Sequence, residues 1–374
     1  TSVTGVQTCA LPIFATVGGY STSGSEDVKV TAVRSTGAAS PTPSPTASPT
    51  ADAEPTAAGV IASGRLAALA STGSARLGVY QDCPTSADDA SVCRSAWTVA
   101  EAHASGLLPG QLSWTVTASG GRFVLAQAGG ARALVVDDSG ATRAVRTVAT
   151  PLTGAALRDA VPVSGPRRYD LIDPATATRS PVSRPVGVRR WQTVTTDGAG
   201  GLWAFAFGDG TPGPMDVWHS PDGTAWSSSR IQLPLSDTAF PAYLEADGTH
   251  AAALAGYDGA TLLPVAALAV TADAGRGWAI LGADDVPFTF VDGMATAPDG
   301  SLYVLGETDR RGAVTALFRS TDDSWTTFAR VDLPDRLQPS SITRTADGVV
   351  VDGGSGYVVL GDGGTAGPVQ HFPR

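Results

Sequence analysis

An Asp-Gly turn occurs four times in the second half of the chain at an almost constant interval. The copies are centred on Asp197, Asp247, Asp299 and Asp347, so successive turns are 50, 52 and 48 residues apart. Most lie between two apolar runs, which predicts a β-hairpin whose glycine takes a positive φ. A period of about fifty residues predicts a repeat protein in which each unit is one supersecondary element.

A second kind of turn follows 23 to 26 residues after each of the first three Asp-Gly turns. In such a turn Asp accepts backbone N–H bonds, Ser or Thr reinforces them, Gly takes the left-handed position and Trp packs beneath the hairpin. The Asp residues of successive copies are 51 and 49 residues apart. The three copies are formed by Ser220, Asp222, Gly223 and Trp226, by Thr271, Asp273, Gly275 and Trp278, and by Ser320, Asp322 and Trp325.

These turns resemble the Asp-box, the Ser/Thr-x-Asp-x-Gly-x-x-Trp motif of the BNR-repeat, sialidase-like superfamily. The middle copy matches the motif in full. The first is one residue short between Asp and Trp, and the third is two residues short and has lost its Gly. The resemblance covers about residues 191–334 and implies a β-propeller of four-stranded antiparallel blades.

We therefore expect an all-β propeller with seven blades, six being the alternative. Residues 191–374 supply four units, and residues 59–190 show strand-like runs without an Asp-box, which would form three shorter blades. The last unit has no room for a full fourth strand. Because an open ring would leave an unpaired edge, we expect a strand within residues 59–70 to pair into the C-terminal blade and close the ring.

The composition agrees with many short strands and argues against two classes of partner. The chain contains 44 Gly and 26 Pro, carries a net charge of −10 and has a single lysine, Lys29. No cluster of arginines forms a stripe that could follow a phosphate backbone, so we expect no nucleic-acid partner. An acidic chain is also repelled by an anionic membrane surface.

Three segments precede the propeller, which we assign to residues 60–374. Residues 1–13 contain VTGVQTCALPI, which resembles one translated reading frame of a common sequencing adapter and is excluded from fold reasoning. Residues 14–34 are interpreted as the remnant of an export signal or membrane anchor, because the chain does not begin with Met. Residues 35–59 form a Pro/Ser/Thr-rich stalk, whose extended solvated backbone builds no core.

Cys83 and Cys93 remain once Cys9 is set aside with the adapter-like segment. They flank a polar stretch and predict a disulfide, the alternative being two unrelated small hydrophobic residues. The disulfide and the stalk indicate an exported protein, secreted or anchored at the surface of a high-GC bacterium. We expect a monomer without a cofactor, and no metal site, because the four histidines show no ligand spacing.

The candidate binding residues follow from the geometry of a blade. Both repeated turns fall on one face of a propeller, so their aspartates are interpreted as structural. Loops on the opposite rim vary in length and converge on the channel, where carboxylates, a tyrosine and arginines could bind a sugar or an anion. A solvated loop surface is the alternative. The candidate rim residues are Asp209, Tyr257, Asp258, Glu307, Asp309, Arg310 and Arg311.

Three functions are compatible with this pattern. The leading hypothesis is an extracytoplasmic propeller that binds an unknown glycan or protein ligand, or acts as a scaffold. The alternative is an exo-acting glycoside hydrolase with its site at the channel rim, but the early Arg-Ile-Pro motif of sialidases is absent and no catalytic residue is assigned. A third resemblance, to propellers that assist photosystem assembly, implies an arginine-rich patch that the sequence does not show.

Overall fold

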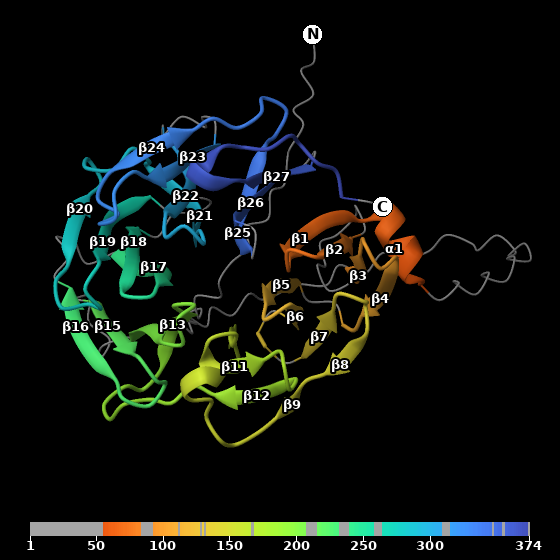
Figure 1. Cartoon of the computed structure of the whole chain (residues 1–374), viewed down its shortest axis with the longest axis horizontal. Coiled ribbons are helices and arrows are strands. Elements are labelled where there is room, and N and C mark those ends of the chain that lie inside the picture. Colours follow the sequence, from red (N-terminus) through yellow and green to blue (C-terminus); the bar gives the residue numbers. More distant parts are fainter. Residues whose placement is uncertain are drawn as a thin grey trace, which may run out of the picture. The chain divides into compact units, whose positions relative to one another are not determined.

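The computed structural model describes residues 55–83, 93–110, 113–127, 129–130, 132–165, 168–206, 215–231, 239–257, 264–308, 315–345, 348–353 and 356–372. Ala57–Arg374 form one compact unit, in which seven small sheets are arranged in a ring (Figure 1). The expected seven-bladed, all-β propeller is therefore confirmed. The single α-helix of the described part, α1 (Ala57–Ser63), precedes the first strand and begins within the last residues of the expected stalk.

The first three blades come from residues 65–181. Blade 1 consists of β1 (Arg65–Ser71), β2 (Arg76–Asp82), β3 (Arg94–Val99) and β4 (Ala104–Leu108). Blade 2 consists of β5 (Trp114–Ser119), β6 (Arg122–Gln127), β7 (Ala133–Asp137) and β8 (Thr142–Ala144). Blade 3 differs: β10 (Val161–Ser164), β11 (Tyr169–Asp173) and β12 (Thr178–Pro181) are joined by the earlier strand β9 (Arg146–Thr147), which pairs in parallel with β12.

The other four blades are antiparallel and follow the chain in order. Blade 4 consists of β13 (Trp191–Thr196), β14 (Leu202–Ala206), β15 (Met215–Ser220) and β16 (Ser227–Ile231). Blade 5 consists of β17 (Ala239–Asp247), β18 (His250–Tyr257), β19 (Val265–Thr271) and β20 (Ala279–Gly282). Blade 6 consists of β21 (Phe290–Thr296), β22 (Leu302–Glu307), β23 (Thr315–Ser320) and β24 (Phe328–Val331). Blade 7 consists of β25 (Pro339–Thr345), β26 (Gly348–Gly353) and β27 (Gly356–Leu360).

The hydrophobic core lies between neighbouring blades. The third strand of blade 5, β19, is buried at all seven positions, whereas the outer strand β8 is exposed at all three. A central strand is covered on both faces by adjacent blades, so its sequence is a continuous apolar run rather than an alternating one. Between blades 5 and 6, for example, Leu254 and Leu268 pack with Phe288, Val304 and Phe318.

Both repeated turns lie on one face of the ring, which we call the turn face. The Asp-Gly turns join the first and second strands of blades 4 to 6, and the Asp-box-like turns join the third and fourth strands of the same blades. The fourth Asp-Gly turn, at Asp347, is outside the described residues. The arrangement follows from antiparallel order, because alternate connections of a four-stranded sheet emerge at the same end.

The three Asp-box-like turns share a carboxylate that accepts backbone N–H bonds. Asp222 accepts two such bonds at 2.8 Å, Asp273 one at 2.9 Å and Asp322 one at 3.0 Å. The backbone bonds lower the pKa of Asp222 to about 2. In the first copy the left-handed position is held by Gly223, with φ of 78°, whereas in the third, which lacks Gly, Trp325 itself has φ of 57°.

No strand within residues 59–70 pairs into blade 7, so the expected closure of the ring is wrong. β1 pairs with β2 as the first strand of blade 1, and blade 7 contains three strands in the described part. The C-terminal tail lies along β27 instead. Gln370 exchanges two backbone bonds with Tyr357, at 2.8 and 2.9 Å, and the Gly367 N–H donates to the Val359 carbonyl at 3.0 Å. A partner from the same end of the chain closes a shorter loop and therefore costs less entropy.

Blades 1 and 7 meet through side chains, in a region that we call the seam. One buried cluster there combines Val60 and Ile61 of α1 with Tyr80 of β2, Tyr357 of β27 and Phe372 of the tail. The N-terminal segment therefore packs beside the last blade without pairing with it. These contacts close the ring without strand exchange.

Cys83 and Cys93 form the expected disulfide, which joins the residue after β2 to the residue before β3. In the part of the chain that the structure describes, no helix is long and apolar enough to cross a membrane. Within the same residues, no group of three or more His, Cys, Asp or Glu side chains is placed to hold a metal ion. The adapter-like segment, the signal remnant and most of the expected stalk lie outside the described residues.

Candidate functional site

Most of the candidate rim residues fall outside the described part of the chain. Asp209, Asp258, Asp309, Arg310 and Arg311 are not described, and Tyr257 is described only as the last residue of β18. The remaining candidate, Glu307, is the last residue of β22 and lies on the rim opposite the turn face. Of the charged side chains expected at this rim, only the carboxyl of Glu307 lies within the described residues.

Glu307 belongs to a small cluster with Asp292 and Tyr243, which we call the rim cluster. Asp292 lies at a β-bulge of β21, and the Tyr243 hydroxyl donates to the Asp292 backbone carbonyl at 3.1 Å. Burial raises the pKa of Asp292. Burial, followed by the charge of Asp292, raises the pKa of Glu307 and brings that of Tyr243 to about 12. Both carboxyls therefore keep their protons to higher pH than exposed carboxyls do.

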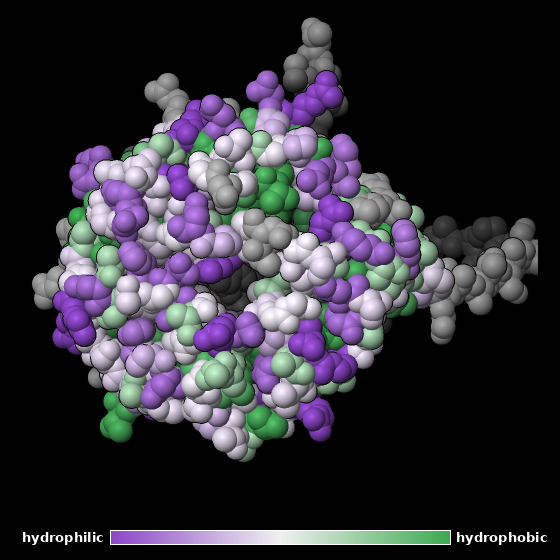
Figure 2. Space-filling view, in the orientation of Figure 1, coloured by the Kyte–Doolittle hydropathy of each residue, from purple (hydrophilic) through white to green (hydrophobic). Residues whose placement is uncertain are grey.

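Hydrophilic side chains also border part of the central hollow of the ring (Figure 2). Arg344 of β25 bonds to Thr296 of β21 at 2.6 Å and to Asp247 of β17 at 3.2 Å, so one guanidinium connects blades 5, 6 and 7. Nearby on β17, burial raises the pKa of Glu245 to about 8, although the charge of Arg344 opposes the change. Glu245 is therefore mostly protonated at neutral pH.

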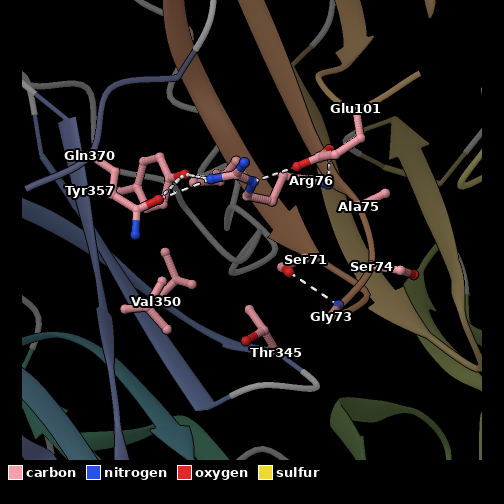
Figure 3. Close-up of a pocket in the computed structure, with 12 residues that line it drawn as sticks. Ser71, Gly73, Ser74, Ala75, Arg76, Glu101, Thr345, Val350, Tyr357 and Gln370 are labelled. Carbon is pink, nitrogen blue, oxygen red and sulfur yellow. Dashed lines mark hydrogen bonds and ion pairs between the residues drawn. The ribbon is translucent and has the colours of Figure 1, made fainter. Parts of the chain in front are cut away.

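A cavity of about 230 Å³ lies at the seam between blades 1 and 7 (Figure 3). Arg76 extends from β2 across the cavity, toward Tyr357 and Gln370 of the last blade and tail. Its Nη1 donates to the Tyr357 hydroxyl and, at 2.9 Å, to Oε1 of Gln370. Arg76 therefore lines the pocket and links the two blades.

The charge of Arg76 is balanced within the pocket by Glu101. Arg76 Nε lies 2.7 Å from Glu101 Oε1, and the Arg76 backbone N–H donates to Oε2 at 2.7 Å. Burial opposes the charged form of each group, but their mutual bonds prevail, so the pKa of Glu101 is lowered and that of Arg76 is raised. Both groups stay charged at neutral pH, and the pair leaves the pocket without net charge.

Hydroxyl groups and aliphatic side chains form the rest of the lining. Ser71, the last residue of β1, lies opposite Thr345 at the end of β25, and Leu69 and Val350 supply apolar surface. Ser74 is at the edge of the pocket, where its hydroxyl donates to Asp138. A concave site with apolar walls and a few polar groups is the usual form of a small-molecule site. The volume is below the roughly 300–1,000 Å³ of sites for drug-sized ligands, so it suits one small unit.

No pattern in the sequence indicated this pocket. Its residues come from both ends of the propeller, and Arg76 and Tyr357 are 281 residues apart. The pocket also opens beside the β1–β2 and β3–β4 turns, on the turn face, which the repeat pattern had indicated as structural. The pocket could have been predicted only from the way in which the first and last blades meet. The expected closing strand gave the wrong arrangement there.

Comparison with known proteins gives distant similarities. No protein-family model matches the chain, and no curated protein matches it. A streptogramin B lyase structure is similar with a TM-score of 0.43 and 14% identity, over 70% of this chain and 83% of that one. YCF48 from Cyanidioschyzon merolae has a TM-score of 0.44 and 11% identity, over 78% and 94%. The β-propeller domain of the Trilobed protease from Pyrococcus furiosus has a TM-score of 0.45 and 10% identity, over 77% and 88%.

Proposed function

We propose that the chain is an extracytoplasmic binding propeller whose seam pocket takes one small, uncharged, hydroxyl-rich unit, such as a sugar of a glycan. The pocket lining carries this proposal: serine, threonine and tyrosine hydroxyls stand beside aliphatic walls, and the one arginine is neutralised by Glu101. An anionic ligand would compete with Glu101 for the guanidinium, whereas a neutral polyol needs only hydrogen bonds.

The location and the family are part of the same proposal. The disulfide between Cys83 and Cys93 of blade 1 fits an oxidising compartment, and the Pro/Ser/Thr-rich segment would hold the propeller away from a cell surface. The three Asp-containing turns support placing the chain in the BNR-repeat, sialidase-like superfamily. Their hydrogen bonds are those that the motif requires.

The pocket is tested by blocking it without disturbing the core. Ser74 is an exposed residue of the β1–β2 turn at the edge of the pocket, so Ser74→Trp should cover it. Glycan-array screening of the full chain would identify a ligand, and calorimetry should then show binding weakened roughly tenfold or more in the variant, about 1.4 kcal/mol.

Thr249→Trp is the matched control, because Thr249 is also exposed in a hairpin turn of the turn face, but in blade 5. It should bind like the unmodified chain. Equal affinity of all three proteins for every glycan that binds would show that the pocket is not the site.

A glycoside hydrolase acting at the opposite rim is the second candidate, favoured by the rim cluster. Asp292 and Glu307 have raised pKa values, and a general acid must hold its proton near neutral pH. Release of nitrophenol from aryl glycosides by the full chain, lost in Glu307→Gln, would support this function. Hydrolysis that persists in Glu307→Gln would argue against this site.

A further inference from the structure

Positive charge is concentrated in residues 122–190, about a fifth of the propeller. Residues 122–190 contain 11 arginines and five acidic residues, whereas residues 191–374 contain nine arginines and 22 acidic residues. Between Asp173 and Asp197 there is no acidic residue at all. Blades 2 and 3 are therefore basic within an acidic protein, a local contrast that the net charge of −10 conceals.

The connection from β12 to β13, residues 182–190, lies in this basic region, and we call it the arginine loop. Val186 at its tip is fully exposed, at 103%. Gly187 has φ of 93°, and the Val188 N–H donates to the Pro185 carbonyl at 3.2 Å, which defines a tight turn around the exposed valine. The valine is therefore held outward by the backbone.

The base of the loop is anchored on blade 4. Ser183 accepts one bond at its carbonyl from Trp191 Nε1, at 3.1 Å, and one at its hydroxyl from Trp226 Nε1, at 2.9 Å. Its own hydroxyl donates to the Gly223 carbonyl. Val182 is buried, and Val188 packs against the same core. A projection with a fixed base loses little conformational entropy when it binds, which favours recognition.

Arginines flank the exposed valine on both sides. Arg184, Arg189 and Arg190 are all exposed, and Arg184 Nη1 donates to the Arg189 carbonyl, which holds the loop closed. Arg190 lies close enough to Tyr169 of β11 for its charge to act on the phenol. No carboxylate of the described residues forms an ion pair with Arg184 or Arg190. Their charges are available to an external partner.

We propose that the arginine loop docks a protein partner whose surface presents carboxylates around an apolar hollow that accepts Val186. The aliphatic side chain of Val186 would fill the apolar hollow, and the guanidinium groups beside it would pair with the carboxylates. The contact of a single loop is smaller than the ~1,600 Å² of a standard interface. The complex should therefore be transient and weakened by salt.

The loop fits a protein surface better than a membrane or a nucleic acid. Stable anchoring to a membrane takes more than one short apolar side chain, and the acidic remainder of the chain opposes approach to anionic lipid. Nucleic acid is followed by a stripe of cations, usually with aromatic side chains that stack on bases. The arginine loop offers one compact cationic turn with an aliphatic tip.

The experiment uses the full chain and defined probes in place of the unknown partner. Fluorescence anisotropy would measure binding of a short peptide of alternating Glu and Leu, with a Glu-Ser and a Lys-Leu peptide for comparison. Phosphatidylcholine vesicles containing phosphatidylglycerol, and oligothymidylate, would represent the other two classes. The variants are Arg184→Gln/Arg190→Gln and Val186→Ser, and the control is Arg276→Gln/Arg330→Gln, which removes two exposed arginines elsewhere.

We expect the Glu-Leu peptide to bind and the Lys-Leu peptide not to bind. The loop double variant should weaken Glu-Leu binding about five- to thirtyfold at low salt, and the control pair less than about twofold. Val186→Ser should weaken Glu-Leu binding and leave Glu-Ser binding unchanged. The proposal is overturned if the unmodified chain binds no acidic peptide, if the control pair weakens binding equally, or if vesicles or oligothymidylate bind more tightly through the loop. Thermal unfolding would verify that each variant is folded.

Discussion

Glu245 shows how a carboxyl is accommodated on an inner strand. Its neighbours along β17, Leu244 and Ala246, are 4% and 1% exposed and fix the strand in the core. The guanidinium of Arg344 is already bonded to Asp247 and Thr296, so its charge offsets only part of the cost of ionising Glu245. Burial therefore prevails, and the pKa of Glu245 rises to about 8.

This raised pKa predicts a pH-dependent stability. A carboxyl whose pKa is raised on folding contributes stability that is fully present below about pH 4.5 and is lost as pH rises through about 8. We expect the free energy of unfolding to fall by about 1–3 kcal/mol over that range. This is less than the full ~1.4 kcal/mol per pKa unit, because the side chain keeps some contact with solvent, which screens its charge. Glu245→Gln, neutral at every pH, should remove most of this slope in denaturant titrations.

Glu101→Gln serves as a control, because folding shifts the pKa of Glu101 in the opposite direction to that of Glu245. Because the pKa of Glu101 is lowered, its contribution is present throughout pH 5.5–8 and is lost only in more acidic solution. Its removal should therefore lower stability by a constant amount over that range. A slope unchanged in Glu245→Gln would contradict the assignment.

At the scale of elements, the C-terminal tail lies along β27, at the position where the other blades have a fourth strand. Its backbone bonds to β27 complete the edge of blade 7, while Phe372, two residues beyond Gln370, packs into blade 1 beside Tyr80, with ring centroids 6.2 Å apart. The absence of a side chain at Gly78 makes this possible, since a Cβ there would lie 2.8 Å from the ring of Phe372. One tail thus serves both sides of the seam.

Phe372→Ala should therefore destabilise the whole propeller, although the residue is near the end of the chain. Removal of a buried aromatic ring costs about 3 kcal/mol, to be measured as a shift of the unfolding midpoint in urea. His371→Ala is the matched control, because the preceding side chain is exposed, and it should change stability by less than about 0.5 kcal/mol. Equal effects of the two substitutions would mean that the tail does not pack into the seam.

Across the whole molecule, the sequence predicted what depends on local contacts. The turns at Asp222 and Asp273 recur because each stabilises its own hairpin, so their period revealed the phase of the blades. The period and the chain length together left seven or six as the number of blades. The closure and the pocket depend on contacts such as that of Arg76 with Tyr357, 281 residues away, which leave no periodic trace. The arginine loop was missed for a different reason: its three arginines are ordinary in the sequence, and only the structure shows that they flank an exposed valine, Val186, in a tight turn.

The seam is the one place in the ring where adjacent blades are not consecutive in the chain. Elsewhere a peptide connection limits how far two blades can separate, but blades 1 and 7 are held by the buried cluster and by the bonds of Arg76 to Tyr357 and Gln370. We therefore expect the seam to open before the ring unfolds, with faster amide hydrogen exchange in β1, β25 and β27 than in β18 and β19.

Arg76→Gln should accelerate exchange at the seam roughly tenfold, about 1.4 kcal/mol, and leave β18 and β19 unchanged. Arg230→Gln, which removes an exposed ion pair within blade 4, should have little effect at the seam. Uniform exchange across all seven blades would instead mean that the ring opens only by global unfolding.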